Sequence, residues 1–311
     1  MGEGIVTRST GSWYEIIDKE GGIYSARLRG KFKQTIKNLS NPVAVGDEVV
    51  FEEDEEEGTV VINVIKPRRN HIIRRSPRNQ HKKHIVASNI DQAFLLVTLA
   101  NPRTSLGFID RFLINCGTYH IPVSLLFNKS DLLTDKLTAK QDEVISLYDS
   151  LGYSSFVLSA HTGEGLQSVR DALKDKVTLL AGHSGVGKSS LANALEPGLG
   201  IRVKDISKQS GKGQHTTTYA AMLKLNIGGW MVDTPGIKEF GIVDLDREEV
   251  GHYFKEFVEL LDHCKFSNCM HLNEPKCAVI EALQQGKIAE SRYVSYLSML
   301  DDIETAAPDW A

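Results

Sequence analysis

The chain has 311 residues, a hydrophobic content of 41% and a net charge of −4 at pH 7. This composition supports buried cores in two or three domains and excludes a polycationic protein, so any surface for nucleic acid must be local. The first residues show neither the basic segment nor the apolar core of a secretion signal, and no apolar run approaches the length of a membrane span. We therefore expect a cytoplasmic protein that has no membrane partner.

Short β-type runs dominate the first 67 residues, with turn signals such as Gly21-Gly22 and Gly58 between them. The expected strands are residues 5–7, 13–17, 23–28, 49–51 and 60–65. This pattern predicts a small antiparallel barrel over residues 1–67, with an OB-fold as the leading candidate. Such barrels often bind single-stranded nucleic acid through aromatic side chains, although each candidate here could equally be a core residue. The candidates are Trp13, Tyr14, Tyr24 and Phe32.

The segment from Gly58 to Ile90 contains no acidic residue. Its basic residues are Lys66, Arg68, Arg69, Arg74, Arg75, Arg78, Lys82 and Lys83, with His71, His81 and His84 among them. We expect this basic stretch to contact RNA, the alternative being an ordinary solvated surface, and residues 68–90 within it to form a basic linker. The acidic run at 52–57 just before it predicts a solvated hairpin loop.

Strands and helices alternate from Asp91 onward. The expected strands are residues 93–97, 123–127, 156–158 and 177–181, and the expected helices are residues 109–119, 139–151, 165–176 and 190–195. This alternation predicts an α/β domain over residues 91–243, a mostly parallel sheet with helices on both faces. Ligands bind such sheets at the carboxyl ends of the strands, so the loops after Phe127, Leu158, Ala181 and Val232 should converge.

A glycine-rich loop, GHSGVGKS, joins one of these strands to a helix. Its residues are Gly182, His183, Ser184, Gly185, Val186, Gly187, Lys188 and Ser189, and Ser190 follows in the helix. This spacing in this context is typical of a loop whose backbone N–H groups surround phosphate oxygens. We expect Lys188 to pair with the β- and γ-phosphates and the Ser189 hydroxyl to ligate Mg²⁺. The alternative is a plain glycine turn.

Two further loops carry groups suited to a guanine base. The sequence NKSD, comprising Asn128, Lys129, Ser130 and Asp131, follows a buried strand. The Asp131 carboxylate could accept from N1–H and the exocyclic amine of guanine, a donor pair that adenine lacks. Asn128 could donate to guanine O6, and Lys129 could lie along the base. After the next strand, Ser159-Ala160 could offer backbone N–H groups to O6.

Downstream lies the sequence DTPG, residues 233–236. Asp233 could hold Mg²⁺ through water, and the Gly236 N–H could reach the γ-phosphate. The polar segment 207–219 before it predicts a switch, in which Thr217 would close over Mg²⁺. After DTPG stands Ile237, whose side chain can neither donate nor accept a proton and so cannot orient an attacking water. His215 is therefore the candidate to orient the water, with an ordinary loop histidine as the alternative.

Three of the four cysteines crowd near a histidine towards the end of the chain. The set is Cys264, Cys269, His271 and Cys277, between helices expected at residues 248–261 and 278–285. Three thiolates and one imidazole suit one tetrahedral zinc ion, and four ligands leave no position for substrate. We expect a structural zinc site in a helical domain over residues 244–311, with a last helix at 291–303.

The boxes GHSGVGKS, DTPG, NKSD and SA resemble those of the GTPase superfamily, but here the guanine boxes precede the phosphate loop. This order resembles the circularly permuted GTPases. With the amino-terminal barrel, the HTTT sequence at 215–218 and the cysteine cluster, residues 3–300 resemble the RsgA family of ribosome biogenesis GTPases.

The resemblance implies a monomeric GTP hydrolase that exchanges GTP and GDP. It would bind the small ribosomal subunit and its rRNA late in maturation and leave on hydrolysis. Two other classes of function stay open. One is an RNA-binding scaffold in which nucleotide is only structural, and the other is a GTP-dependent translation factor.

Overall fold

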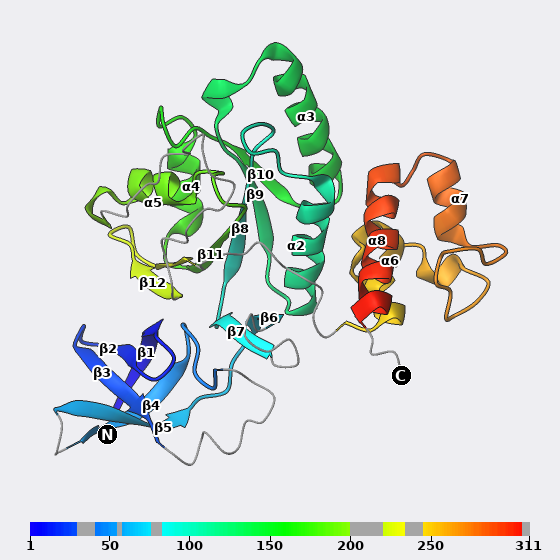
Figure 1. The fold of residues 1–311 in the computed structure, drawn as a ribbon. Coiled ribbons are helices and arrows are strands. Elements are labelled where there is room, and N and C mark those ends of the chain that lie inside the picture. The colour runs from blue at the N-terminus through cyan, green and yellow to red at the C-terminus, as the bar shows by residue number, and fades with distance from the viewer. Residues whose placement is uncertain (30–40, 55–57, 76–82, 200–219, 234–244, 307–311) are drawn as a thin grey trace.

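A computed structural model describes residues 1–29, 41–54, 58–75, 83–199, 220–233 and 245–306. Figure 1 shows three regions: a barrel of strands, an α/β domain, and a group of helices at the carboxyl end beside α2 (Leu106–Thr118). The overall architecture predicted from the sequence is therefore confirmed.

The amino-terminal region is a closed five-stranded barrel. Strands pair in the order β1-β2-β3-β5-β4, and an additional β1–β4 pairing closes the ring, as in an OB-fold. The strands are β1 (Gly2–Ser9), β2 (Tyr14–Asp18), β3 (Ile23–Leu28), β4 (Glu48–Asp54) and β5 (Thr59–Ile65). Alternate residues such as Val6, Ile16 and Ile62 fill the core. The expected acidic loop is partly wrong, because residues 52–54 continue β4.

The α/β domain is a sheet covered by helices on both faces (Figure 1). Its order is β10-β9-β8-β11-β13-β12, parallel except for β12 at the edge, a strand that we did not predict. The strands are β8 (Gln92–Val97), β9 (Val123–Phe127), β10 (Ser154–Val157), β11 (Val177–Ala181), β12 (Ala221–Lys224) and β13 (Trp230–Asp233). On one face α2 and α3 (Asp135–Ser150) pack in one core cluster, and on the other α4 (Leu166–Leu173) and α5 (Lys188–Leu195) pack in a second.

Barrel and sheet are continuous. Strand β1 pairs with β12 through Arg8 and Ala221, so the two regions share one eleven-stranded sheet. The barrel is therefore docked on one edge of the α/β sheet.

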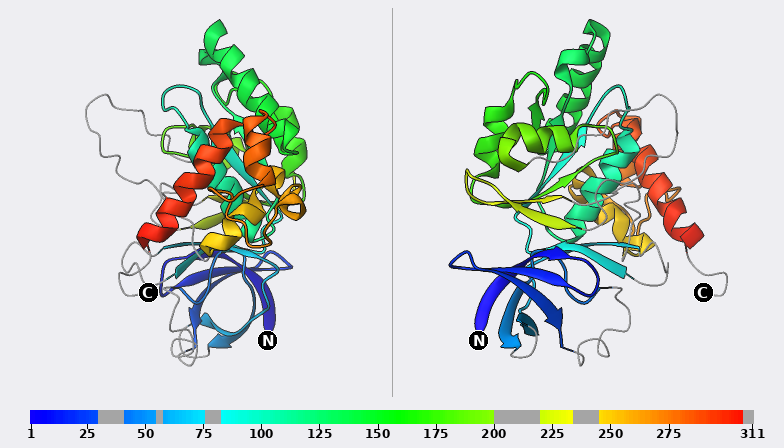
Figure 2. Two further views of the ribbon diagram at one scale, coloured as in Figure 1. Left: turned by 90° about the vertical axis from the view of Figure 1, so that its right-hand side faces the viewer. Right: turned by 60° about the vertical axis from the view of Figure 1, so that its left-hand side comes forward.

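The segment expected as a linker contains a two-stranded sheet of β6 (His71–Arg75) and β7 (Lys83–Ser88). Figure 2 shows this hairpin between the barrel and the α/β domain. Ile72, Ile73 and Ile85 are at most 2% exposed, which explains why the segment folds despite its charge. The segment expected as a basic linker over residues 68–90 therefore contains a hairpin that its sequence did not indicate.

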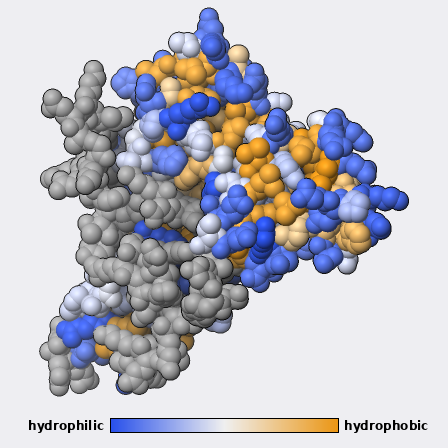
Figure 3. Space-filling model, turned by 45° about the vertical axis from the view of Figure 1, so that its right-hand side comes forward, coloured by the Kyte–Doolittle hydropathy of each residue, from blue (hydrophilic) through white to orange (hydrophobic). Residues whose placement is uncertain are grey.

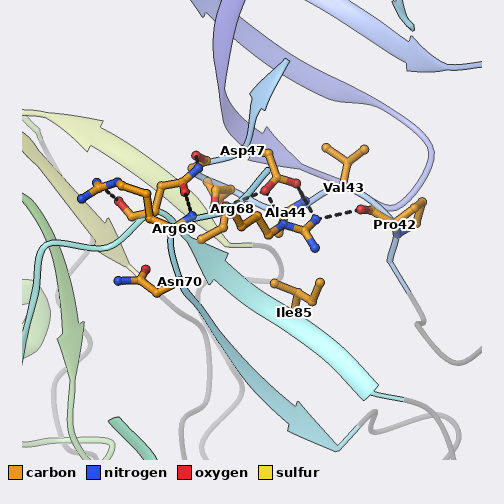
Figure 4. Close-up of polar contacts among 12 residues, drawn as sticks. Pro42, Val43, Ala44, Asp47, Arg68, Arg69, Asn70 and Ile85 are labelled. Atoms are coloured by element: carbon orange, nitrogen blue, oxygen red, sulfur yellow. Dashed lines mark hydrogen bonds and ion pairs between the residues drawn. The ribbon is translucent and has the colours of Figure 1, made fainter. Parts of the chain in front are cut away.

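Two arginines of the basic segment form ion pairs with aspartates. The Arg68 guanidinium donates to both carboxylate oxygens of the fully buried Asp47 at 2.6 and 2.7 Å, and also to the Pro42 carbonyl, as Figure 4 shows. Arg69 pairs with Asp91 at 2.9 Å. The Arg68 side chain is therefore withdrawn from any RNA-binding surface, whereas the Arg69 side chain is 61% exposed and stays at the surface.

The carboxyl-terminal helices differ from the expected pattern in one place. The helix expected at 248–261 is broken into a 3₁₀ helix (Arg247–Tyr253), α6 (Lys255–Val258) and a further 3₁₀ turn (Leu261–His263). Phe254 is extended between the first two, and its ring stacks on Phe257 at 4.9 Å in the core. Because both rings are buried in the core, the chain does not continue as the single helix that the spacing of its apolar residues predicts. The expected helices that follow are confirmed as α7 (Ala278–Gln284) and α8 (Glu290–Ala306).

Hydrophobic side chains reach the surface of the carboxyl-terminal helices between hydrophilic ones, as Figure 3 shows. Val258, Phe266 and Val294 are among those exposed. Among the described residues, no helix combines the length and the apolar character that crossing a membrane requires.

Candidate nucleotide site and metal centre

The phosphate loop follows β11 and leads into α5, as its sequence predicts. Gly182, Gly185 and Gly187 have φ values of +140°, +86° and +102°, which residues other than glycine rarely adopt. A Cβ on Gly187 would overlap the Asn128 amide, and one on Gly182 would lie 2.8 Å from the Leu96 carbonyl. The glycines are therefore required by the closeness of neighbouring loops as well as by the turn itself.

Lys188 reaches back over the loop. Its ammonium donates to the carbonyls of Gly182 and His183 at 2.6 and 2.8 Å. Burial lowers the pKa of Lys188, and the negative charge of Asp233 partly offsets this effect. Burial likewise raises the pKa of Asp233, which Lys188 partly offsets. The site thus holds a half-buried cation and a half-buried carboxylate, an arrangement suited to a phosphate and its metal ion.

The predicted base-recognition loop is tied directly to the phosphate loop. The Asn128 side chain donates to the Val186 carbonyl at 2.8 Å and accepts from the Ala160 N–H at 3.0 Å. Lys129 donates to the Gly185 carbonyl at 2.8 Å. In this structure, the Asn128 amide and the Ala160 N–H group both form hydrogen bonds within the protein. A hydrogen bond from either group to guanine O6 therefore stays a prediction. Their observed role is to fix the two loops against each other.

Asp131 lies in the turn after Lys129, on the same edge. One of its carboxylate oxygens accepts from the Ser159 hydroxyl at 2.6 Å. Ser130 in turn donates to Glu164 at 2.9 Å. The structure therefore brings together the two loops that the sequence assigned to guanine.

Two residues of this edge were missed by sequence reasoning. The Asn101 carbonyl also accepts from Lys129, and Glu164 accepts from Ser130. Asn101 follows the central strand β8, whose carboxyl end lies on the ligand-binding edge of the sheet. That position is the only signal that could have identified it.

The expected Mg²⁺ ligands are partly described. Ser189 lies in the first turn of α5, and Asp233 ends β13, directly beside Leu180 of β11. Both contribute oxygen, the ligand type that Mg²⁺ requires. His215, Thr217 and Gly236 lie outside the described residues, so their roles stay predictions.

The cysteine cluster assembles as predicted. The ligand atoms of Cys264, Cys269, His271 and Cys277 all lie within 4.8 Å of one another. His271 Nδ1 is 3.3 Å from Cys277 Sγ, and the Cys264 and Cys277 sulfurs are 4.0 Å apart. Ligands bonded at about 2.0–2.3 Å to one tetrahedral ion lie at such separations. These four residues can therefore bind a metal ion.

Neighbouring side chains hold the metal-binding loop in shape. The Glu274 carboxylate accepts the N–H groups of Met270, Leu272 and Asn273. From α8, the Tyr293 hydroxyl donates to the His271 carbonyl at 2.7 Å. Because these bonds fix the backbone, the ligand set is preorganised.

The sheet, the phosphate loop and the preceding base-recognition loop together define a circularly permuted GTPase. The particular family follows from comparison with known proteins. The sequence pattern of the RsgA GTPase matches residues 65–243, and that of the RsgA N-terminal domain matches residues 3–61. The chain belongs to the RsgA GTPase family and is a GTP hydrolase.

Relatives named "Small ribosomal subunit biogenesis GTPase RsgA" match nearly the whole chain. The one from Christiangramia forsetii is 49% identical, covering 97% of this chain and 96% of its own. The one from Flavobacterium psychrophilum is 47% identical, with coverages of 98% and 95%.

Two solved structures share the fold. YjeQ from Thermotoga maritima is 36% identical with a TM-score of 0.79, over 98% of this chain and 99% of that one. YloQ, described as a circularly permuted GTPase, is 28% identical with a TM-score of 0.75, over 100% and 97%.

Proposed function

We propose that this GTPase acts late in maturation of the small ribosomal subunit, binding the subunit and its rRNA with GTP and leaving after hydrolysis. The observation that carries the proposal is the joining of three loops at one sheet edge through the Asn128–Val186, Lys129–Gly185 and Ala160–Asn128 bonds. The names and full-length coverage of the relatives support the ribosomal part.

GTP would lie across the carboxyl edge of the sheet. The Asp131 carboxylate selects guanine, and Lys129 supports the base. The N–H groups of the phosphate loop and the Lys188 ammonium hold the β- and γ-phosphates. Because Lys188 is already aimed by two carbonyls, little rearrangement is needed on binding.

Two metal ions belong to this proposal. Ser189, Asp233 and Thr217 would hold Mg²⁺, which neutralises phosphate charge during hydrolysis. The Cys₃His set would hold one structural Zn²⁺, since three thiolates and one imidazole are a donor set that zinc prefers.

In hydrolysis, a water oxygen bonds to the γ-phosphorus while the bond to the β–γ bridging oxygen breaks, giving GDP and phosphate. Lys188 stabilises the charge on the phosphoryl oxygens, and the Gly236 N–H would do the same. We propose that His215 orients the water, because Ile237 can neither donate nor accept a proton. Subunit docking would then bring His215 to the attacking water and raise the rate.

The barrel and the remaining basic side chains of residues 58–90 would contact rRNA. Residues 1–67, 91–243 and 244–311 would form the barrel, GTPase and zinc domains of a cytoplasmic monomer. Residues 68–90 would belong to the junction of the first two domains, because Arg68 and Arg69 bridge them.

One assay tests the proposal. GTP turnover should rise on adding purified small subunits and much less on adding complete ribosomes. Stimulation by complete ribosomes instead would indicate a translation factor. Nucleotide binding with no stimulated turnover would indicate an RNA-binding scaffold.

A further inference from the structure

An aromatic side chain from outside the predicted nucleotide loops lies on the phosphate loop. The Phe108 ring of α2 stacks on the His183 imidazole, with centroids 3.8 Å apart and planes 29° from parallel. His183 is half-buried, whereas the next two residues of the loop, Ser184 and Gly185, are exposed. The stack therefore covers the start of the loop and leaves its tip open.

His183 is also one of the residues that aim the catalytic lysine. Its carbonyl accepts from Lys188 Nζ at 2.8 Å. The stacked ring and this carbonyl belong to the same residue, so a displacement of the His183 Cα on loss of the stack would also displace the carbonyl. Contact with Phe108 thus reaches the Lys188 ammonium through one intervening residue.

The helix that carries Phe108 is held firmly. At its start, the Ser105 hydroxyl caps the helix by accepting from the Phe108 N–H at 3.2 Å. Two residues further on, Asp110 accepts from Tyr148 at 2.7 Å and from Arg292 at 2.6 Å. Phe108 therefore lies on a support fixed from α3 and α8, as accurate placement of a binding group requires.

We propose that Phe108 is a positioning residue for nucleotide phosphates, acting through His183 to hold Lys188. This proposal rests on the guanine-nucleotide site described above. Aromatic pairs of this geometry contribute enough that losing the ring should weaken GDP and GTP binding about three- to tenfold. Guanosine has no phosphate for Lys188, so its binding should change less than about twofold.

The test compares the dissociation constants of GDP, GTP and guanosine for four single variants and one double variant of the full chain. Phe108→Leu should lower the preference for GDP over guanosine, and Phe108→Tyr, which keeps the ring, should restore it. Phe112→Leu is the matched control, because Phe112 is fully buried on the same helix. It should lower thermal stability without changing the preference. Combining Phe108→Leu with His183→Ala should add little to either change alone.

An unchanged preference in Phe108→Leu, an equal fall in Phe112→Leu, or additive effects of Phe108→Leu and His183→Ala would overturn the proposal. A wild-type protein that binds no guanine nucleotide would instead refute the nucleotide site itself. If Phe108→Leu fails to fold, two other variants still test the proposal. Phe108→Tyr should keep the preference for GDP over guanosine, and His183→Ala should lose it.

Discussion

The Asp110 carboxylate on α2 accepts from the Arg292 guanidinium on α8 at 2.6 Å, and both side chains are only 1% exposed. Arg292 also donates to Glu256 of α6 at 2.6 Å and lies over the Phe254 ring, 4.5 Å from its centroid. The GTPase domain and the metal domain thus share one buried charge cluster. The two domains are therefore expected to move as one body.

Arg292→Met should destabilise the protein by about 3–5 kcal/mol, because it leaves two buried carboxylates without their cation. The matched control is Arg111→Met, at an ion pair on the same interface whose partner Asp302 is 54% exposed. This control should cost about 0–1 kcal/mol. Urea unfolding measures the free energy of unfolding of both variants. Equal losses of stability would show that burial of the Asp110–Arg292 pair contributes nothing.

Guanine selection should depend on Asp131. Asp131→Asn should weaken GTP binding about 10- to 100-fold, the value of one or two hydrogen bonds to a charged group, and improve binding of xanthosine triphosphate. Ser130→Ala, in the same loop, removes only the bond to Glu164 and should leave base preference intact. Competition binding with the two nucleotides measures the preference, and an unaltered GTP affinity in Asp131→Asn would reject the assignment.

Loss of one metal ligand should unfold the metal domain. Metal binding to such sets supplies about 10–16 kcal/mol, more than the stability of a small domain. Cys269→Ser should therefore remove the bound zinc and the hydrogen-exchange protection of α7, while the sheet persists. Cys116→Ala is the control, since this buried cysteine belongs to α2, packs in the core of the α/β domain and is not a metal ligand, so metal content should stay unchanged. A folded α7 without metal would contradict the prediction.

Acid should destabilise the hairpin of β6 and β7 through His84. Burial, together with the positive charge of Arg74, lowers the pKa of His84 from 6.5 to about 4. Between these values the unfolded chain takes up a proton that the folded chain does not, so stability falls as pH drops from 6.5 to 4. The loss should be about 1–2 kcal/mol, allowing for partial exposure. His84→Gln should reduce this loss, as followed by hydrogen exchange in β7. The exchange protection of both proteins at pH 8 is the reference. If His84→Gln and the wild type lose protection equally as the pH falls, His84 is excluded as the cause.

His215→Ala should leave GTP binding intact and lower subunit-stimulated turnover about 100-fold or more, the usual effect of losing a group that handles the proton. The measurement is single-turnover hydrolysis with and without small subunits. If the stimulated rate of His215→Ala equals that of the wild type, His215 is not the catalytic group, and the ribosome would be expected to supply it.

Local motifs predicted the barrel, the α/β domain and the metal ligands, because each depends on residues close in the sequence. The hairpin at β6 and β7 was missed because basic residues obscured its buried isoleucines. Contacts such as Asp110–Arg292 join residues 182 apart, and neither residue type indicates its partner. The break at Phe254 follows from packing against Tyr296 of α8, which spacing along one helix does not reveal.

The pairing of β1 with β12 has a consequence for truncated proteins. Without the barrel, the edge of β12 would lose its partner strand at Ala221, and open strand edges recruit strands from other molecules. A chain that begins after the barrel should therefore self-associate. The barrel acts as an edge cap for the GTPase sheet, and its deletion would lower activity through aggregation even where no RNA contact is lost.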